Sequence, residues 1–261
     1  MNTQYETRFL RNKDLIPLKS LTSIDVIGLG GIGSFVVQAL AIMGWRDISG
    51  YDSDDVLCHN LSSTAYTFDD VDMPKKEAAN RLHKRHSEDW QNFYPAGHFD
   101  NEKFIGSKVI VCTDSMASRK MVYELWKKNK PMQSNPFLID LRMGATSLEM
   151  VTVTPDNDNY MDEWIPDGAV EEAPCSMKHT VFATQHIASL GVAQVYNLIG
   201  NLAYYDYIWA RLTPIQYEFG NLIVPKVEGD VNATSTNKSE EGINKLEGNA
   251  VRSNISFHRP A

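Results

Sequence analysis

The sequence predicts an α/β fold in which helices cover both faces of a mostly parallel, twisted sheet. Two observations carry this prediction. Short apolar strands alternate with helical stretches along the chain, and the first strand runs into a glycine-rich turn that opens a helix. That strand, its turn, the helix and the next strand fit within about thirty residues, the size of a βαβ unit with parallel strands.

The first βαβ unit lies near the N-terminus. Residues 1–22 are polar with scattered apolar positions, which predicts an arm or a short helix. The apolar run Ser23–Ile27 predicts a strand, and the mostly apolar segment Ser34–Met43 predicts a buried helix. Ile48–Tyr51 then predicts the second strand.

The middle of the chain continues the alternation. Lys75–Ser87 is rich in charged helix-forming residues and follows Pro74, a residue typical of helix starts. The compact apolar stretch Lys108–Thr113 predicts a buried strand, and the apolar spacing within Ser118–Asn129 predicts a helix.

The last third is predicted to hold two strands, a loop and a long helix. Phe137–Leu141 and Leu148–Thr154 predict strands on either side of a glycine turn. Pro155–Pro174 is acidic and proline-containing, which predicts a surface loop. Val181–Asn201 predicts a long helix, whose extension as far as Arg211 the pattern leaves open.

The length of 261 residues allows one or two domains. We expect an N-terminal arm over residues 1–22 and one Rossmann-like domain over 23–227. Residues 228–261 are rich in Asn, Ser, Glu and Gly with few large apolar side chains, which predicts a flexible C-terminal tail.

Composition excludes several classes of protein. Hydrophobic residues make up 43% and charged residues 22%, values typical of soluble globular chains. A net charge of −8 makes a broad nucleic-acid surface unlikely. Three cysteines form neither a disulfide framework nor a four-cysteine zinc site, which favours a reducing compartment. We find no signal-peptide core, and polar residues interrupt the most apolar stretch, so a soluble, cytoplasmic protein without a membrane span is expected.

The glycine turn has the spacing of a nucleotide-binding loop. Gly28, Gly30 and Gly33 match G-x-G-x-x-G between a strand and a helix, with Gly31 as an additional glycine. Such glycines let phosphates approach the backbone at a helix N-terminus. Asp52 follows the next strand, where a carboxylate can accept hydrogen bonds from ribose. The alternative is a turn that only packs helix against strand.

The loop alone does not distinguish a dinucleotide from ATP. Polar groups in Asp52–Val56 and His59–Leu61 would lie beside the nucleotide. An acidic loop with an asparagine-capped turn explains the same residues without a ligand.

Six motifs in order resemble those of the ThiF/MoeB-type adenylyltransferases, in the superfamily of the ubiquitin-activating enzymes. They are Arg8–Arg11 (R-[YF]-x-R), Val26–Ser34 (V-I-G-x-G-G-[LI]-G-S), Asp52–Leu61 (D-x-D-x-V-x-x-x-N-L), Pro74–Ala79 (G-x-x-K-[AV]-x-[AS]-A), Cys112–Arg119 (C-x-D-[NS]-x-x-x-R) and Pro174–Ser176. Each motif alone is weak, but the ordered set is specific. The resemblance covers roughly residues 5 to 205.

The resemblance implies ATP-dependent activation of a carboxylate, usually the C-terminal glycine of a ubiquitin-like or sulfur-carrier protein. The carboxylate attacks the α-phosphate, pyrophosphate leaves, and an acyl-adenylate results. It assigns nucleotide contacts to these residues: Gly28, Gly30, Gly31, Gly33, Asp52, Asp54, Asn60 and Lys75.

The same resemblance assigns catalytic roles. Lys75 would carry a positive charge to the phosphates, with Lys76 as the alternative register and an exposed helix lysine as the alternative role. Asp114 would be the Mg²⁺-linked carboxylate, or else a helix cap. Arg11 would reach the phosphates of a partner subunit, which implies a homodimer.

Two departures from the family pattern stand out. Ser63 replaces an arginine that would contact phosphates, so either Arg85 or another cation compensates, or adenylation is weakened or lost. The family's paired C-x-x-C motifs are absent, so no structural zinc is expected. Cys112 is interpreted as a core thiol. Cys175 is either a nucleophile that forms a thioester or a helix-start cysteine without a covalent role.

Other functions stay open at this point. Relatives adenylate a peptide carboxylate or one on modified tRNA. A nucleotide-binding pseudoenzyme could serve as an interaction module, which the residue at position 63 favours. An NAD(P)-dependent oxidoreductase needs only the glycine loop and the acid, and the combination of Arg11, Lys75 and Asp114 argues against it.

Overall fold

The computed structural model describes residues 7–12, 14–15, 18–99, 105–129, 135–161 and 180–225. The described residues all fall within a compact unit that extends to Pro225. The predicted tail, residues 228–261, lies outside the described residues.

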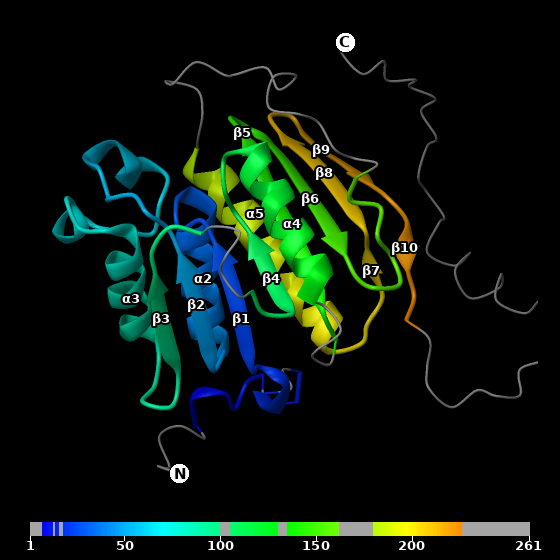
Figure 1. The fold of residues 1–261 in the computed structure, drawn as a ribbon, viewed down its shortest axis with the longest axis horizontal. Helices are drawn as coiled ribbons and strands as arrows, with labels where there is room; N and C mark the ends of the chain where they lie inside the picture. The colour runs from blue at the N-terminus through cyan, green and yellow to red at the C-terminus, as the bar shows by residue number, and fades with distance from the viewer. Residues whose placement is uncertain are drawn as a thin grey trace, which may run out of the picture. The chain divides into compact units, whose positions relative to one another are not determined.

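An eight-stranded mixed sheet forms the centre of the fold, in the order β3-β2-β1-β4-β5-β6-β8-β9 (Figure 1). The strands are β1 (Ser23–Ile27), β2 (Asp47–Tyr51), β3 (Asn92–Ala96), β4 (Lys108–Val111), β5 (Phe137–Gly144), β6 (Ser147–Val153), β8 (Tyr207–Leu212) and β9 (Ile215–Phe219). The first five run parallel, and β6, β8 and β9 continue the sheet antiparallel. A separate pair joins β7 (Tyr204–Tyr205) to β10 (Leu222–Ile223).

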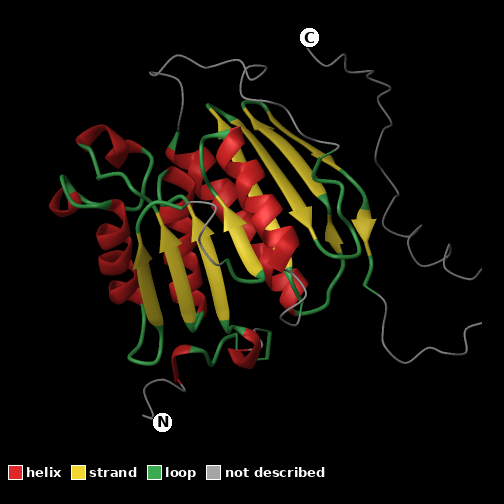
Figure 2. Cartoon of the chain, viewed as in Figure 1, coloured by secondary structure: helices red, strands yellow, loops and turns green. Residues whose placement is uncertain are grey.

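Within the described residues, four α-helices cover the two faces of the sheet, and Figure 2 shows them in red. They are α2 (Gly31–Met43), α3 (Lys75–His86), α4 (Met116–Asn129) and α5 (Val181–Ile199). The same part of the chain also contains the short 3₁₀ helices η1 (Leu18–Ser20), η2 (Cys58–Ser62) and η3 (Phe68–Asp70). The predicted α/β class, with a mostly parallel sheet and helices on both faces, is confirmed.

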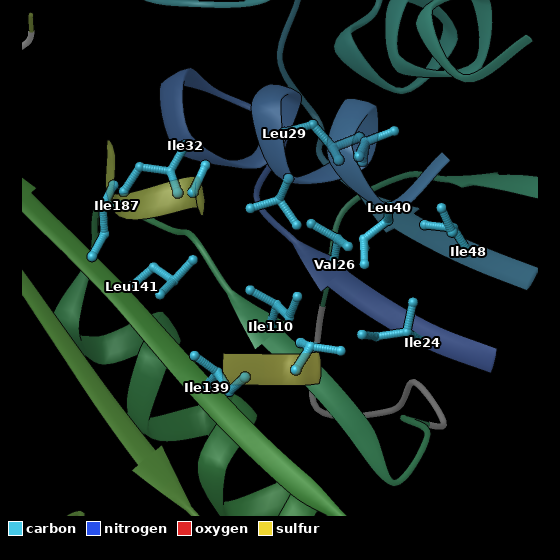
Figure 3. Packing of buried hydrophobic residues seen from close by; sticks show 14 of the residues in the cluster. Ile24, Val26, Leu29, Ile32, Leu40, Ile48, Ile110, Ile139, Leu141 and Ile187 are labelled. Carbon is cyan, nitrogen blue, oxygen red and sulfur yellow. The ribbon is translucent and has the colours of Figure 1, made fainter. Parts of the chain in front are cut away.

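Two apolar clusters explain why helices lie on both faces. Along β1, Ile24 and Val26 belong to the cluster shared with α2, α3 and α5, whereas Ile27 belongs to the cluster shared with α4. This alternation follows from the period of two residues in a strand. Figure 3 shows part of the larger cluster, with Leu40 of α2 and Ile187 of α5 among its members.

The helix predicted over Val181–Asn201 is observed as α5, but the extension to Arg211 that the pattern left open does not form. The long helix ends at Ile199 and does not continue to Arg211, because Gly200 closes it and Asn201 takes a left-handed conformation with φ of 52°. The segment that follows alternates buried and partly exposed side chains through β8, the pattern of a strand. Of the predicted loop Pro155–Pro174, the described part ends at Met161 and contains no helix or strand.

The topology fixes where a ligand can bind. Strands β1 and β4 are neighbours, but the chain turns from β1 toward β2 and returns to β4 only later. Such a switch point at the carboxyl ends of parallel strands is the usual ligand crevice of open α/β sheets. Within the described residues, no helix is long and apolar enough to cross a membrane.

Candidate active site

The glycine loop follows β1 at the switch point, and its glycines have different surroundings. Gly28 has φ of 91°, and a Cβ there would lie 2.8 Å from the Cys112 backbone. A Cβ on Gly33 would overlap the carbonyl oxygen of Gly28, whereas one on Gly30 would meet nothing within 4 Å. The first and third glycines therefore allow close packing, and the middle one faces open space at the start of α2.

Helix α5 supports the loop from one side. A Cβ on Gly31 would lie 2.9 Å from Thr184 Cγ2 and 3.2 Å from the carbonyl oxygen of Ser63. The side chain of Ser34 in α2 accepts a hydrogen bond from the Ala65 backbone N–H over 3.0 Å. The start of α2 is thereby fixed to the segment after η2.

Asp52 follows β2 and connects to the glycine loop. Its carboxylate accepts hydrogen bonds from the backbone N–H of Leu29 (2.8 Å) and that of Asp54 (2.9 Å). Burial raises the pKa of the Asp52 carboxyl above its ordinary value, and Lys75 Nζ, 3.8 Å away, acts in the opposite direction. The side chain is 11% exposed, so it is fixed in place beside the loop.

The two candidate lysines point to different places. Lys75 Nζ donates to Asp54 Oδ2 over 2.8 Å and is only 12% exposed, whereas Lys76 Nζ lies by Gly97, beyond β3.

Tyr66, which the sequence gave no reason to select, donates from its hydroxyl to the Leu29 carbonyl oxygen over 2.7 Å. The same hydroxyl lies 3.4 Å from the Lys75 carbonyl oxygen, so it joins the glycine loop to the start of α3.

Asn60 and Ser63 lie at the two ends of one 3₁₀ turn. Asn60 Oδ1 accepts a hydrogen bond from the Leu57 backbone N–H over 2.9 Å, which caps η2. Ser63 is 4% exposed, and its neutral hydroxyl supplies no positive charge to the glycine loop. Arg85 does not replace the missing arginine. It lies in the last turn of α3, about 15 Å along the helix from Lys75, and 4.0 Å from the Asp70 carboxylate.

Asp114 follows β4 at the same edge of the sheet and is exposed. It does not cap α4, because Ser115 Oγ accepts the Ser118 backbone N–H over 3.3 Å. The residue before it is fixed by Arg119, whose guanidinium donates to the Thr113 carbonyl oxygen and to the Asp140 carboxylate. The carboxylate is therefore free of helix capping and attached to a rigid strand end.

The two arginines of the N-terminal motif lie at the other end of the sheet. Arg8 donates to the carbonyl oxygens of Ala41 (2.9 Å) and Ile42 (3.1 Å) in α2 and to that of His86 (2.6 Å) in α3. These helix ends are remote from the carboxyl ends of β1 and β2 (Figure 1). Arg11, which is exposed, thus lies far from the glycine loop of its own chain.

The cysteines differ in setting. Cys58 is exposed, and burial raises the pKa of the Cys112 thiol far above its ordinary value, which makes it unreactive. Cys175 lies outside the described residues. In the part of the chain that the structure describes, no three His, Cys, Asp or Glu side chains gather into a metal site.

The arrangement fits a nucleoside triphosphate and a metal ion held mainly by phosphates. The open space at Gly30 and the free N–H groups of α2 suit phosphate, and Asp52 suits ribose. Asp114 offers one exposed carboxylate, and Mg²⁺ is usually held by one or two carboxylates together with substrate phosphates.

A comparison with family models decides the family: the ThiF family model matches residues 1–203. The chain belongs to the ThiF family. Among curated protein sequences none matches. Solved structures of ThiF-like proteins share the fold. PaaA has 14% identity and a TM-score of 0.65, with 87% of this chain and 76% of PaaA covered. E. coli MccB has 17% identity and a TM-score of 0.65, with 90% and 75% covered.

MccB has also been solved with ATP, at 17% identity, a TM-score of 0.58, and 88% and 74% coverage of the two chains. ThiF membership supports an adenylyltransferase-type enzyme that uses ATP.

Proposed function

We propose that this protein adenylates the C-terminal carboxylate of a ubiquitin-like or sulfur-carrier protein, with ATP and Mg²⁺. The observation that carries the proposal is the open position at Gly30, with Asp52, Lys75 and Asp114 around it at one edge of the sheet. Membership of the ThiF family supports adenylation as the chemistry.

Each residue has a defined task in this reaction. The N–H groups at the start of α2 bind phosphate oxygens, and Asp52 holds the ribose. Lys75, paired with the 68% exposed Asp54, can leave that partner and turn to the phosphates. Asp114 would hold Mg²⁺, which neutralises negative charge on the phosphates as the carboxylate attacks. Asn60 would donate a hydrogen bond from its side-chain amide toward the phosphates.

A second copy of the chain would complete the site. Arg11 is remote from its own glycine loop, and Arg8 attaches the arm that carries it to the C-terminal end of α2. A groove of about 270 Å³ between α2 and α5 continues from this point and includes Ile42, which is 50% exposed. If two copies pair with their α2 helices antiparallel, the arm of each lies near the partner's glycine loop at Gly30.

A mixed dimer tests this sharing. An Arg11→Ala chain and an Asp114→Ala chain are each expected to be inactive alone. When equal amounts of the two chains pair at random, half the dimers are mixed. In each mixed dimer, the site on the Arg11→Ala chain keeps its own Asp114 and receives Arg11 from the partner, so one of the two sites is intact. Activity should therefore recover to about a quarter of wild type. No recovery in mixtures that exchange subunits would contradict the shared site.

The polypeptide acceptor has a second candidate form. MccB was solved with selenomethionine-labelled MccA, at 17% identity and a TM-score of 0.63, with 86% of this chain and 73% of MccB covered. Because MccA carries selenomethionine, it is a polypeptide. A dedicated polypeptide is therefore as good a candidate for the acceptor of this chain as a carrier protein.

ATP–pyrophosphate exchange, measured with candidate acceptors, tests the proposed activity. Exchange that requires an acceptor with a free C-terminal carboxylate supports adenylation. Asp114→Asn is expected to abolish it with little change in Tm, because the side chain is exposed. ATP binding without exchange for any acceptor would instead indicate an interaction module that has lost catalysis, in keeping with the buried Ser63.

We further propose that Cys175 accepts the activated acyl group as a thioester. The thiolate attacks the acyl carbon, AMP leaves, and a hydroxylamine-sensitive conjugate forms. Cys175→Ala should then spare exchange and remove the conjugate. A conjugate that survives in this variant would exclude the role.

A further inference from the structure

A buried polar network lies beside Asp114, at the carboxyl ends of β4 and β5. Arg119 links the Thr113 carbonyl oxygen to Asp140. Arg142 continues the network, because its Nε donates to Asp140 Oδ2 over 2.8 Å and its Nη1 to a Glu149 oxygen over 3.3 Å. None of these contacts is needed to bind a nucleotide at the glycine loop.

Two atoms of this network are buried without a hydrogen-bond partner among the described residues: Thr113 Oγ1 and Arg142 Nη2. Their residues belong to one set of contacts, because Arg119 contacts both Thr113 and Asp140, and Asp140 contacts Arg142. Arg142 is 8% exposed. A buried donor without an acceptor destabilises a fold, so two of them at one strand edge suggest a ligand that supplies oxygen atoms.

The chemistry of the two groups narrows the ligand class. A guanidinium N–H donates to an oxygen and suits a carboxylate, and a threonine hydroxyl can donate to a second oxygen. Thr113 directly precedes Asp114, so a carboxylate bound here would lie next to the phosphates that Asp114 serves through Mg²⁺. The glycine loop already accounts for the phosphates and ribose.

We propose that Arg142 and Thr113 form the acyl subsite, which binds the terminal carboxylate of the polypeptide acceptor and, after adenylation, its carbonyl oxygen. This inference rests on the proposed function and names the residues that orient the attacking group. Both atoms are closed off from water, so hydrogen bonds that the acyl group makes to them form in a dry environment, where they are strong.

A pair of nucleosides isolates the acyl contribution. Glycylglycyl-sulfamoyl-adenosine is a stable mimic of an acyl-adenylate, and sulfamoyl-adenosine lacks the acyl group. Calorimetry on the full chain should show that the wild type binds the acyl compound roughly tenfold more tightly. Thr113→Val and Arg142→Lys should each reduce this advantage to about twofold and leave the Kd of sulfamoyl-adenosine within about twofold.

Thr152→Val is the matched control. Thr152 pairs with Ile139 in the sheet, but its hydroxyl accepts a hydrogen bond from Gln194 Nε2 of α5 over 2.9 Å, whereas Asp140 is contacted by Arg119 of α4. Its loss should lower Tm and leave the acyl advantage intact. Thr113→Val keeps the volume of the side chain and removes no hydrogen bond of the hydroxyl, so it tests the subsite even if Arg142→Lys does not fold.

The outcomes separate the two proposals. A full acyl advantage in folded Thr113→Val overturns the acyl subsite and leaves adenylation untouched. Loss of affinity for both compounds in the variants would show that Arg142 and Thr113 support the nucleotide site rather than the acyl group. A wild-type chain that binds neither compound refutes the proposed function and this inference with it.

Discussion

We expect the two arginines of the N-terminal motif to differ in role, with Arg8 structural and Arg11 catalytic, and replacing each with methionine tests this. Arg8→Met keeps an unbranched apolar stem and removes every hydrogen bond of the guanidinium. Three of these bonds go to the carbonyl oxygens of Ala41, Ile42 and His86, at 2.9, 3.1 and 2.6 Å. These carbonyls lie at the negative ends of two helix dipoles, where a cation is stabilising.

The magnitude follows from those three contacts. Hydrogen bonds to a charged group contribute about 1.5–3 kcal/mol when buried, and partial exposure of the Arg8 side chain, 24%, reduces this to about 1 kcal/mol each. The expected loss is therefore about 3 kcal/mol, a fall in Tm of roughly 6–12 °C for a domain of this size. Arg11 is exposed, so Arg11→Met should change the free energy of unfolding by less than about 0.5 kcal/mol.

Urea unfolding and ATP–pyrophosphate exchange on both variants give the decisive comparison. We expect Arg8→Met to unfold at lower urea and, where folded, to retain exchange. Arg11→Met should unfold like the wild type and lose exchange. If Arg8→Met matches the wild-type urea midpoint, the hydrogen bonds of Arg8 to the C-terminal ends of α2 and α3 contribute nothing to the free energy of unfolding, and the estimate of about 3 kcal/mol is wrong. Wild-type exchange in Arg11→Met would remove the argument for a shared site.

Three further predictions follow from individual side chains. Gly33→Ala should destabilise the fold by at least about 2 kcal/mol and abolish ATP binding, whereas Gly30→Ala, with open space around its Cβ, should fold normally and weaken ATP binding alone, as calorimetry would show. Lys75→Met should reduce exchange by at least about tenfold and Lys76→Met by less than about twofold, because only the first faces the loop; equal losses would contradict this. Burial lowers the pKa of His83 to about 4. Near pH 6.5 the imidazole is therefore protonated in the unfolded chain but stays neutral in the folded chain. The free energy of unfolding should fall by about 2 kcal/mol between pH 7 and pH 5, and urea titrations should show a shallower fall for His83→Leu.

The sequence predicted the central parallel strands well because they are buried on both faces. It did not predict the edge strand β3, most of whose side chains are exposed. Ser23–Ile27 and Lys108–Thr113 are rich in Val and Ile, and the strands β1 and β4 lie within them. The antiparallel half was harder. Tyr207–Leu212 follows a long helix and carries aromatic and aliphatic residues that fit helix and strand alike, so its pairing with β6 decided its conformation.

The candidate site shows the same limit. Glycine spacing and the acid after β2 could be predicted because local motifs specify them. The partners of Tyr66 and Arg8 come from residues far along the chain, and no local pattern marks them. The choice between Lys75 and Lys76 likewise depended on which side of α3 faces the loop.

The central place of β1 has a consequence for synthesis on the ribosome. One of its neighbours, β2, follows within a few residues of α2, but the other, β4, ends at Val111, 84 residues after Ile27 (111 − 27). At about 5–20 residues per second, roughly 4–17 s pass before that neighbour is made. During this interval an apolar strand edge stays open in the nascent chain, the condition in which chaperones bind and aggregation begins. Slow codons between β2 and β4 should therefore lower the yield of soluble protein more than slow codons after β6.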